Sequence, residues 1–140
     1  MEEDAMSLMT WDKEQFGTNV SAHDQEHQEI FRLVNKLGDA VGVGDRTSIG
    51  KQLDALIDYV AKHFAAEEAN FAKFEYPAFA AHKAEHDKLV ATCLDLQKKF
   101  HAGEAEVTGE TANFVVGWLK NHIPTIDKLY GPFLNEKGVV

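Results

Sequence analysis

Four segments of the chain repeat apolar residues at steps of three and four, the period of an α-helix that buries one face. Short breaks rich in Gly, Pro or charged residues separate them. Ser21 is expected to cap the first helix, and Gly131-Pro132 to end the last. We expect helices over about 21–41, 47–74, 78–101 and 108–130. Since no strand-like alternation competes, the predicted fold is all-α, an antiparallel up-down-up-down four-helix bundle.

The length of 140 residues and the hydrophobic content of 44% fit one domain with its own core. We expect this four-helix domain to occupy residues 21–131. An N-terminal non-helical arm over 1–20 is expected to pack on the bundle through Trp11, Phe16 and Val20. Residues 132–140 are expected to form a C-terminal tail.

Composition excludes several partners. The net charge of −9 argues against nucleic acid and anionic membrane surfaces, because both reward clustered Lys and Arg. No basic start followed by an apolar stretch indicates a signal peptide, and no run approaches the roughly 18 apolar residues of a membrane span. The single cysteine, Cys93, cannot form an intramolecular disulfide and is expected to be a small core residue. We therefore expect a cytoplasmic protein without membrane insertion, acting as a monomer.

Two of the predicted helices each carry a pair of possible metal ligands four residues apart. The second contains His63 and Glu67, and the third contains His82 and His86. Residues at this spacing project from the same side of a helix. One such pair alone is common by chance and is more often a solvated surface feature than a metal site.

The first and last predicted helices add further ligand types. His27 lies on the first helix, and His122 lies on the last with Asp127 five residues later. Metal sites in helix bundles are built from inward side chains on facing helices. Four helices that each supply a ligand type therefore favour a metal centre over a bundle with scattered histidines.

The chemistry of these donors narrows the metal. Five imidazoles and two carboxylates without a thiolate exceed the four ligands of one zinc, and they are too rich in nitrogen for calcium or magnesium. Imidazole with carboxylate suits iron, and seven donors divide over two metals if both carboxylates bridge. Carboxylate-rich di-iron oxygenases use Glu-x-x-His on two helices, and that motif does not occur in this chain.

Four motifs carry a family resemblance. They are DQEH at 24–27, HFAAEE at 63–68, Tyr76-Pro77 followed by His82 and His86, and WLKNHI at 118–123 with Asp127 after it. In these motifs the chain resembles the hemerythrin family, and within it the single-domain bacterial hemerythrins (bacteriohemerythrins). The similarity extends over nearly the whole chain, from 11 to about 130.

The resemblance implies reversible binding of molecular oxygen at a non-haem di-iron centre with an oxo or hydroxo bridge. It implies that His82, His86 and His122 bind one iron. His27 and His63 would bind the other iron, which keeps a position open for oxygen. Glu67 and Asp127 would bridge both irons. Candidate residues of the oxygen pocket are Leu119, which matches a family pocket residue, and Phe64, Ile123 and Ile126.

The spacing of Asp127 departs from simple helix geometry. Five residues after His122 it would lie about 140° around an ideal helix, although the family shares this spacing. Pro124 lies between the two and removes a backbone donor. We expect a kink or a π-type widening there that re-aims Asp127.

Two further histidines need an interpretation. His23 forms a second four-residue pair with His27, at a position where the family usually has an aliphatic residue. The Asp-x-x-His pattern favours His27 as the ligand, so His23 is expected near the site or at the surface. His101, in the last turn of the third helix, is expected to be a favourable helix-end charge.

These features predict an oxygen-binding protein for carriage, storage or delivery, with oxygen as ligand, an oxygen-consuming enzyme as a candidate partner and no catalytic residue. The alternatives are an oxygen- or redox-sensing module, and a di-iron oxidase, peroxidase or nitric-oxide-handling protein. The lifetime of the oxygenated form separates a carrier from an oxidase.

Overall fold

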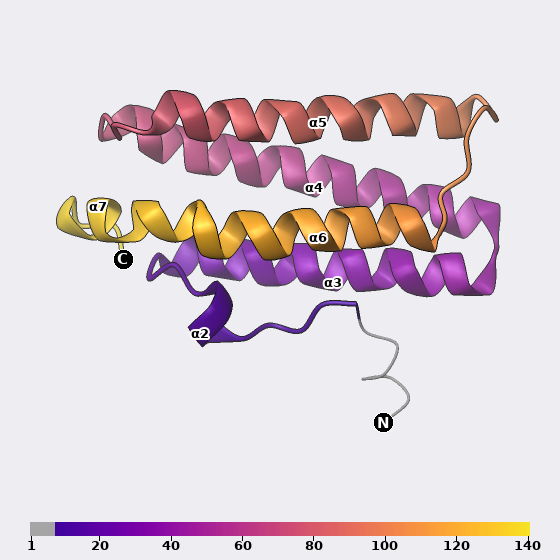
Figure 1. The fold of residues 1–140 in the computed structure, drawn as a ribbon, viewed down its shortest axis with the longest axis horizontal. Coiled ribbons are helices and arrows are strands. Elements are labelled where there is room, and N and C mark those ends of the chain that lie inside the picture. The colour runs from indigo at the N-terminus through magenta and orange to yellow at the C-terminus, as the bar shows by residue number, and fades with distance from the viewer. Residues whose placement is uncertain (1–7) are drawn as a thin grey trace.

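Four long helices lie side by side and alternate in direction in the computed structural model, which describes residues 8–140 (Figure 1). The bundle helices are α3 (Ser21–Val43), α4 (Arg46–Lys73), α5 (Phe79–His101) and α6 (Gly109–Thr125). No strand forms within the described part of the chain. The predicted all-α bundle is therefore confirmed, and each predicted start lies within two residues of the observed one.

Local interactions set the ends of α3 and α4. Gly44 ends α3 in the left-handed conformation with φ of 85°, which glycine adopts without a Cβ penalty. The Asp45 side chain then caps α4 by accepting from the Ser48 backbone N–H at 3.4 Å, and it also accepts from the Ser48 hydroxyl at 2.7 Å. The expectation that Ser21 caps α3 was wrong. Ser21 is the first helical residue and the cap, Val20, has no side-chain acceptor.

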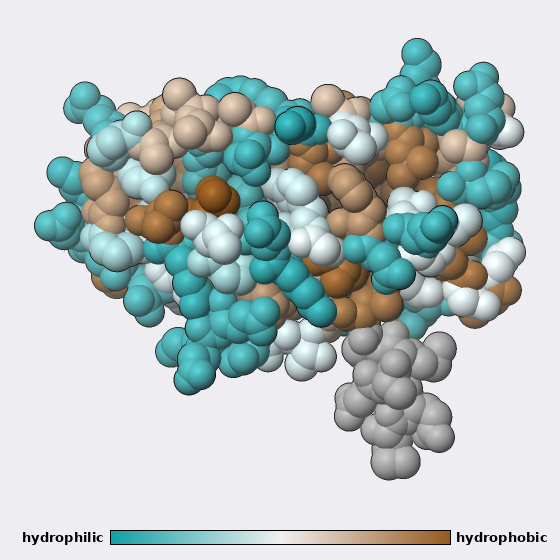
Figure 2. Space-filling view, viewed as in Figure 1, coloured by the Kyte–Doolittle hydropathy of each residue, from teal (hydrophilic) through white to brown (hydrophobic). Residues whose placement is uncertain are grey.

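Apolar side chains fill the bundle in two separate clusters. The larger cluster runs along the four long helices and includes Val34, Leu37, Leu53 and Leu119. The smaller lies where α4 ends and the last helix begins, and it consists of Val20, Phe71, Tyr76, Tyr130 and Leu134. Hydrophobic residues are also exposed on the molecular surface between α5 and α6 (Figure 2). No helix among residues 8–140 is long and apolar enough to cross a membrane.

The end of the chain differs from the prediction. The fourth helix does not run to residue 130 and stop at Gly131-Pro132. Instead α6 ends at Thr125, a 3-10 turn η1 covers Asp127–Leu129, and α7 (Tyr130–Glu136) continues through the Gly-Pro pair. Proline is tolerated there because the N–H groups of the first helical turn have no intrahelical partner. The predicted tail is therefore partly helical, and Leu134 within it is fully buried.

The N-terminal arm contains one helical turn, α2 (Lys13–Phe16), so the expectation of a wholly non-helical arm was wrong. Phe16 and Val20 are buried, and the rings of Phe16 and Trp11 lie 4.9 and 5.7 Å from that of Phe31 on α3. The predicted anchors thus hold the arm against the bundle. Residues 1–7 of the predicted arm lie outside the described part of the chain.

Substitutions at two glycines, Gly131 and Gly117, test how tightly α7 packs against the chain before α3. A Cβ at Gly131 would overlap the backbone carbonyl oxygen of Thr18, whereas a Cβ at Gly117, at an exposed position of α6, would meet nothing within 4 Å. We expect Gly131→Ala to lower the free energy of unfolding by about 1–3 kcal/mol, because backbone must shift. Gly117→Ala should raise it by about 0.5–1 kcal/mol. Urea unfolding of both variants measures the difference, and equal effects would contradict this packing.

Candidate metal centre

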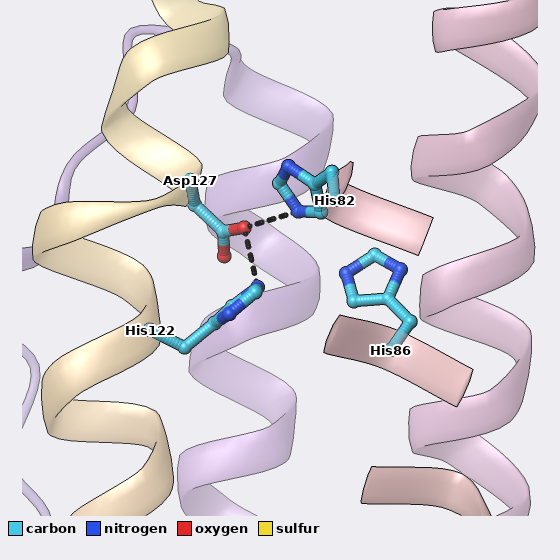
Figure 3. A group of neighbouring side chains, drawn as sticks. All are labelled: His82, His86, His122 and Asp127. Atoms are coloured by element: carbon cyan, nitrogen blue, oxygen red, sulfur yellow. Dashed lines mark ion pairs between the residues drawn. The ribbon is translucent and has the colours of Figure 1, made fainter. Parts of the chain in front are cut away.

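The predicted ligands converge at one end of the bundle. All are buried, with at most 2% of each residue exposed. They form two groups, within each of which the possible ligand atoms lie within 4.8 Å of one another. The groups are His82, His86, His122 and Asp127, and His27, His63 and Glu67. Figure 3 shows the first group, with Asp127 directed at His82 and His122.

Helix geometry explains most of this convergence. His63 and Glu67 lie one turn apart on α4, and their Nε2 and Oε2 atoms are 3.1 Å apart. Asp127 reaches the site differently. The α-helix stops one turn after His122, and the 3-10 turn that follows brings Asp127 Oδ1 to 2.9 Å from His122 Nε2. The re-aiming expected around Pro124 is thus achieved by ending α6, and not by a π-type widening.

Glu67 faces both groups. Its Oε2 lies 3.1 Å from His63 Nε2 and 3.4 Å from His27 Nε2. Its Oε1 lies 3.2 Å from His86 Nε2 in the other group. Each oxygen of this carboxylate therefore faces a different group of histidines.

The two oxygens of Asp127 likewise face different groups of histidines. Its Oδ2 lies 3.1 Å from His27 Nε2, and its Oδ1 lies 2.9 Å from both His82 Nε2 and His122 Nε2. Two carboxylates that each turn one oxygen to each group form the arrangement needed to bridge two metal ions.

The hydrogen bonding of the site fits bound metal. Several buried polar atoms of the two groups have no hydrogen-bond partner, an uncommon state for groups of this burial. They include Nε2 of His63, His82, His86 and His122, Oε1 of Glu67 and Oδ1 of Asp127. Metal ions between these atoms would satisfy them, and the donor set of imidazole and carboxylate suits iron.

In the metal-free site the carboxylates raise the pKa of His63 and His82, and the histidines lower the pKa of the carboxylates. Burial lowers the pKa of His63, but Glu67 and Glu26 more than offset this and raise it to about 10. The pKa of His82 rises to about 9, because Asp127 and Glu67 outweigh burial. Burial would raise the pKa of Glu67 and of Asp127, yet the surrounding imidazoles hold both well below their usual range. The metal-free site thus keeps its carboxylates ionised at neutral pH.

Two carboxylates outside the groups orient the ligands, and the prediction did not include them. Glu26 Oε1 accepts from His63 Nδ1 at 2.6 Å, and Glu68 Oε2 accepts from His86 Nδ1 at 2.8 Å. Each contact turns the Nε2 atom of its histidine into the site. Both carboxylates directly adjoin a predicted ligand in the sequence, and this position could have identified them.

Aromatic rings form the walls of the site. Phe64, predicted as a pocket residue, stacks on His86 with ring centroids 3.7 Å apart and an interplanar angle of 2°. Trp118, which the pocket prediction missed, stacks on His122 at 4.1 Å. Phe71 lies 4.7 Å from His82. These rings pack against the three histidines of the same group.

The other predicted pocket residues occupy different depths. Leu119 and Ile123 on α6 are buried, and Leu119 also lines an apolar cavity of about 50 Å³ between the four helices. Ile126 is half-buried and lines a surface hollow together with Tyr76 and His82. It therefore lies beside the outer face of the three-histidine group.

The two remaining histidines differ in their surroundings. His23 is buried beside the site, where burial lowers its pKa, and it belongs to neither group. Its Nε2 lies 3.0 Å from the Asn70 side-chain nitrogen. His101 is exposed at the end of α5, and its Nε2 contacts Asp54 Oδ1 at 2.8 Å.

Known proteins resemble this chain over most of its length. The family described as the hemerythrin HHE cation binding domain matches residues 18–134. A bacteriohemerythrin of Methylococcus capsulatus is 62% identical over 130 residues, covering 93% of this chain and 99% of the relative. One of Stenotrophomonas maltophilia is 31% identical, covering 89% and 80%. A crystal structure of wild-type hemerythrin matches with a TM-score of 0.88 and 63% identity, covering 89% of this chain and 96% of that one.

The raised histidine pKa values predict proton release on metal binding. At pH 7, below the pKa values of about 10 and about 9, His63 and His82 are protonated in the metal-free protein. Metal binds neutral imidazole, so loading with a divalent ion should release about two protons or more. Metal affinity should accordingly fall as the pH is lowered. A pH indicator in weak buffer measures the release, with His101→Ala as a control that should release equally. Loading without proton release would contradict the assigned pKa values.

Proposed function

The chain belongs to the hemerythrin family, and we propose that it binds molecular oxygen reversibly at a non-haem di-iron centre. The observation that supports this most directly is that each of the two buried carboxylates, Glu67 and Asp127, turns one oxygen to each of the two groups of histidines. A single ion would leave one oxygen of each carboxylate without a metal.

In this proposal the two irons have unequal ligand sets. His82, His86 and His122 would hold one iron and His27 and His63 the other, and Glu67 and Asp127 would each supply an oxygen to both. The group of His27 and His63 contributes one histidine fewer, which would leave room there for oxygen. When bound, the iron pair supplies the redox chemistry of reversible oxygen binding.

The protein residues contribute orientation and exclusion of water. Glu26 and Glu68 accept from the Nδ1 atoms of His63 and His86, which fixes the ring orientation of one histidine on each iron. Leu119, one turn before His122, and Ile123, directly after it, are almost fully buried apolar residues. Such a lining disfavours entry of water and of charged reductants, so that bound oxygen leaves as oxygen.

We assign the protein a role in carriage, storage or delivery of oxygen, with an oxygen-consuming enzyme as its partner and no catalytic residue of its own. We further propose that it works as a monomer in the cytoplasm. The net charge of −9 supports a small neutral ligand in preference to nucleic acid.

Metal content and reversibility test this function. The anaerobically prepared chain should hold about two irons, as the seven donors require. Air should produce visible absorption that disappears again when oxygen is removed. Absorption that decays within seconds to the oxidised protein, without recovery of the reduced state, would favour an oxidase and contradict the carrier role.

Two histidine variants test the ligand assignment. His27→Ala removes a buried ligand whose Nε2 lies 3.1 Å from Asp127, and it should lower the iron content and abolish oxygen-dependent absorption. His101→Ala removes an exposed histidine and should change neither. Inductively coupled plasma analysis and optical titration measure both properties. Full iron content in His27→Ala would place the ligand elsewhere.

A further inference from the structure

A sixth buried histidine lies beside Glu67 but outside both ligand groups. His23 precedes His27 by one turn of α3 and is 2% exposed. Its Nδ1 has no hydrogen-bond partner and lies 3.9 Å from Glu67 Oε2. Its ring meets Tyr130 edge to face, with centroids 5.0 Å apart. A polar atom this deep and directed at a carboxylate indicates a role for His23 toward Glu67.

Asn70 determines which nitrogen of His23 carries the proton. The Asn70 side-chain nitrogen lies 3.0 Å from His23 Nε2. An amide nitrogen donates and does not accept, so Nε2 must be the unprotonated acceptor and the neutral ring carries its proton on Nδ1. The field of Glu67 favours the same tautomer, because an N–H dipole is attracted to a carboxylate and a lone pair is repelled.

Its position separates His23 from the predicted ligand histidines. His23 belongs to neither group of possible ligand atoms, and in this tautomer its Nδ1–H faces Glu67. The group of His27, His63 and Glu67 therefore contains two histidines and not three. What His23 supplies is a donor near Glu67 Oε2, the oxygen that faces His27 and His63.

Tyr130 supports the same oxygen directly. Its hydroxyl donates to Glu67 Oε2 at 2.8 Å, and its ring packs on His23. Both groups reach Glu67 from the end of the bundle formed by α7 and the start of α3. Donors around a ligating carboxylate fix its orientation and weaken its donation to the metal.

We propose that His23, held in its Nδ1–H tautomer by Asn70, is a positioning residue that sets the orientation and donor strength of Glu67. The proposal rests on the proposed function in one respect, that Glu67 bridges the two irons.

Nitrogen-15 NMR of the full-length metal-free chain tests the tautomer without reference to iron. Two-bond couplings of the His23 ring should show the proton on Nδ1. Asn70→Ala removes the donor to Nε2 and should allow the proton to occupy Nε2 as well as Nδ1. Asn113→Ala, a change at an exposed position, should leave the ring unchanged. A wild-type ring protonated on Nε2 would overturn the proposal.

Reduction potential tests the consequence in the iron-loaded protein. His23→Leu removes the donor without adding charge, so Glu67 should donate more strongly and favour the oxidised irons. We expect a lower potential and faster autoxidation at unchanged iron content, and Asn70→Ala should shift both in the same direction by a smaller amount. Should His23→Leu fail to fold, Asn70→Ala keeps the ring and releases its tautomer.

The possible failures are distinguishable. If the wild-type chain takes up no iron or binds no oxygen reversibly, the proposed function fails while the NMR result stands. If it binds oxygen and the variants at His23 and Asn70 keep the wild-type potential, the positioning role is wrong.

Discussion

Two buried carboxylates, Glu67 and Asp127, determine how the rest of the site must be built. A carboxylate withdrawn from water costs several kcal/mol unless it is paired and hydrogen-bonded. Each of these two is fully enclosed and surrounded by imidazoles from several helices. In the metal-free chain protonated histidines provide the compensating charge, and two metal ions would take over this role. The bundle thus holds a site whose charges balance either way, with protons or with metal.

The site lies between the two apolar clusters, and both support it. Phe64 of the larger cluster stacks on His86, while Phe71 and Tyr130 of the smaller one pack against His82. The smaller cluster is completed by α7, which contributes Tyr130 and Leu134. The residues after Thr125 therefore do more than extend a helix. They deliver Asp127 to the site and close it with Tyr130.

The candidate ligands are hydrogen-bonded by surrounding residues, which act as acceptors toward histidines and as donors toward a carboxylate. Glu26 and Glu68 accept from the outer nitrogens of His63 and His86, and Tyr130 donates to Glu67. Acceptors behind imidazoles strengthen their donation to metal, whereas donors behind a carboxylate weaken it. The proposed role of His23 belongs to the second kind. The two kinds together set the electron density that reaches each metal.

The sequence by itself determined the four long helices, because helical periodicity is a local property. Four-residue spacing likewise predicted that His63 lies beside Glu67 and His82 beside His86, one turn of helix apart. The interpretation of His122 and Asp127 depended more on the family resemblance. The path after Pro124 depends on tertiary structure, since α7 is held by the close approach of Gly131 to Thr18 and by burial of Leu134. The same holds for His23. Its distance from Glu67 and its contact with Asn70 join α3 to α4, and only the packing of the two helices decides it.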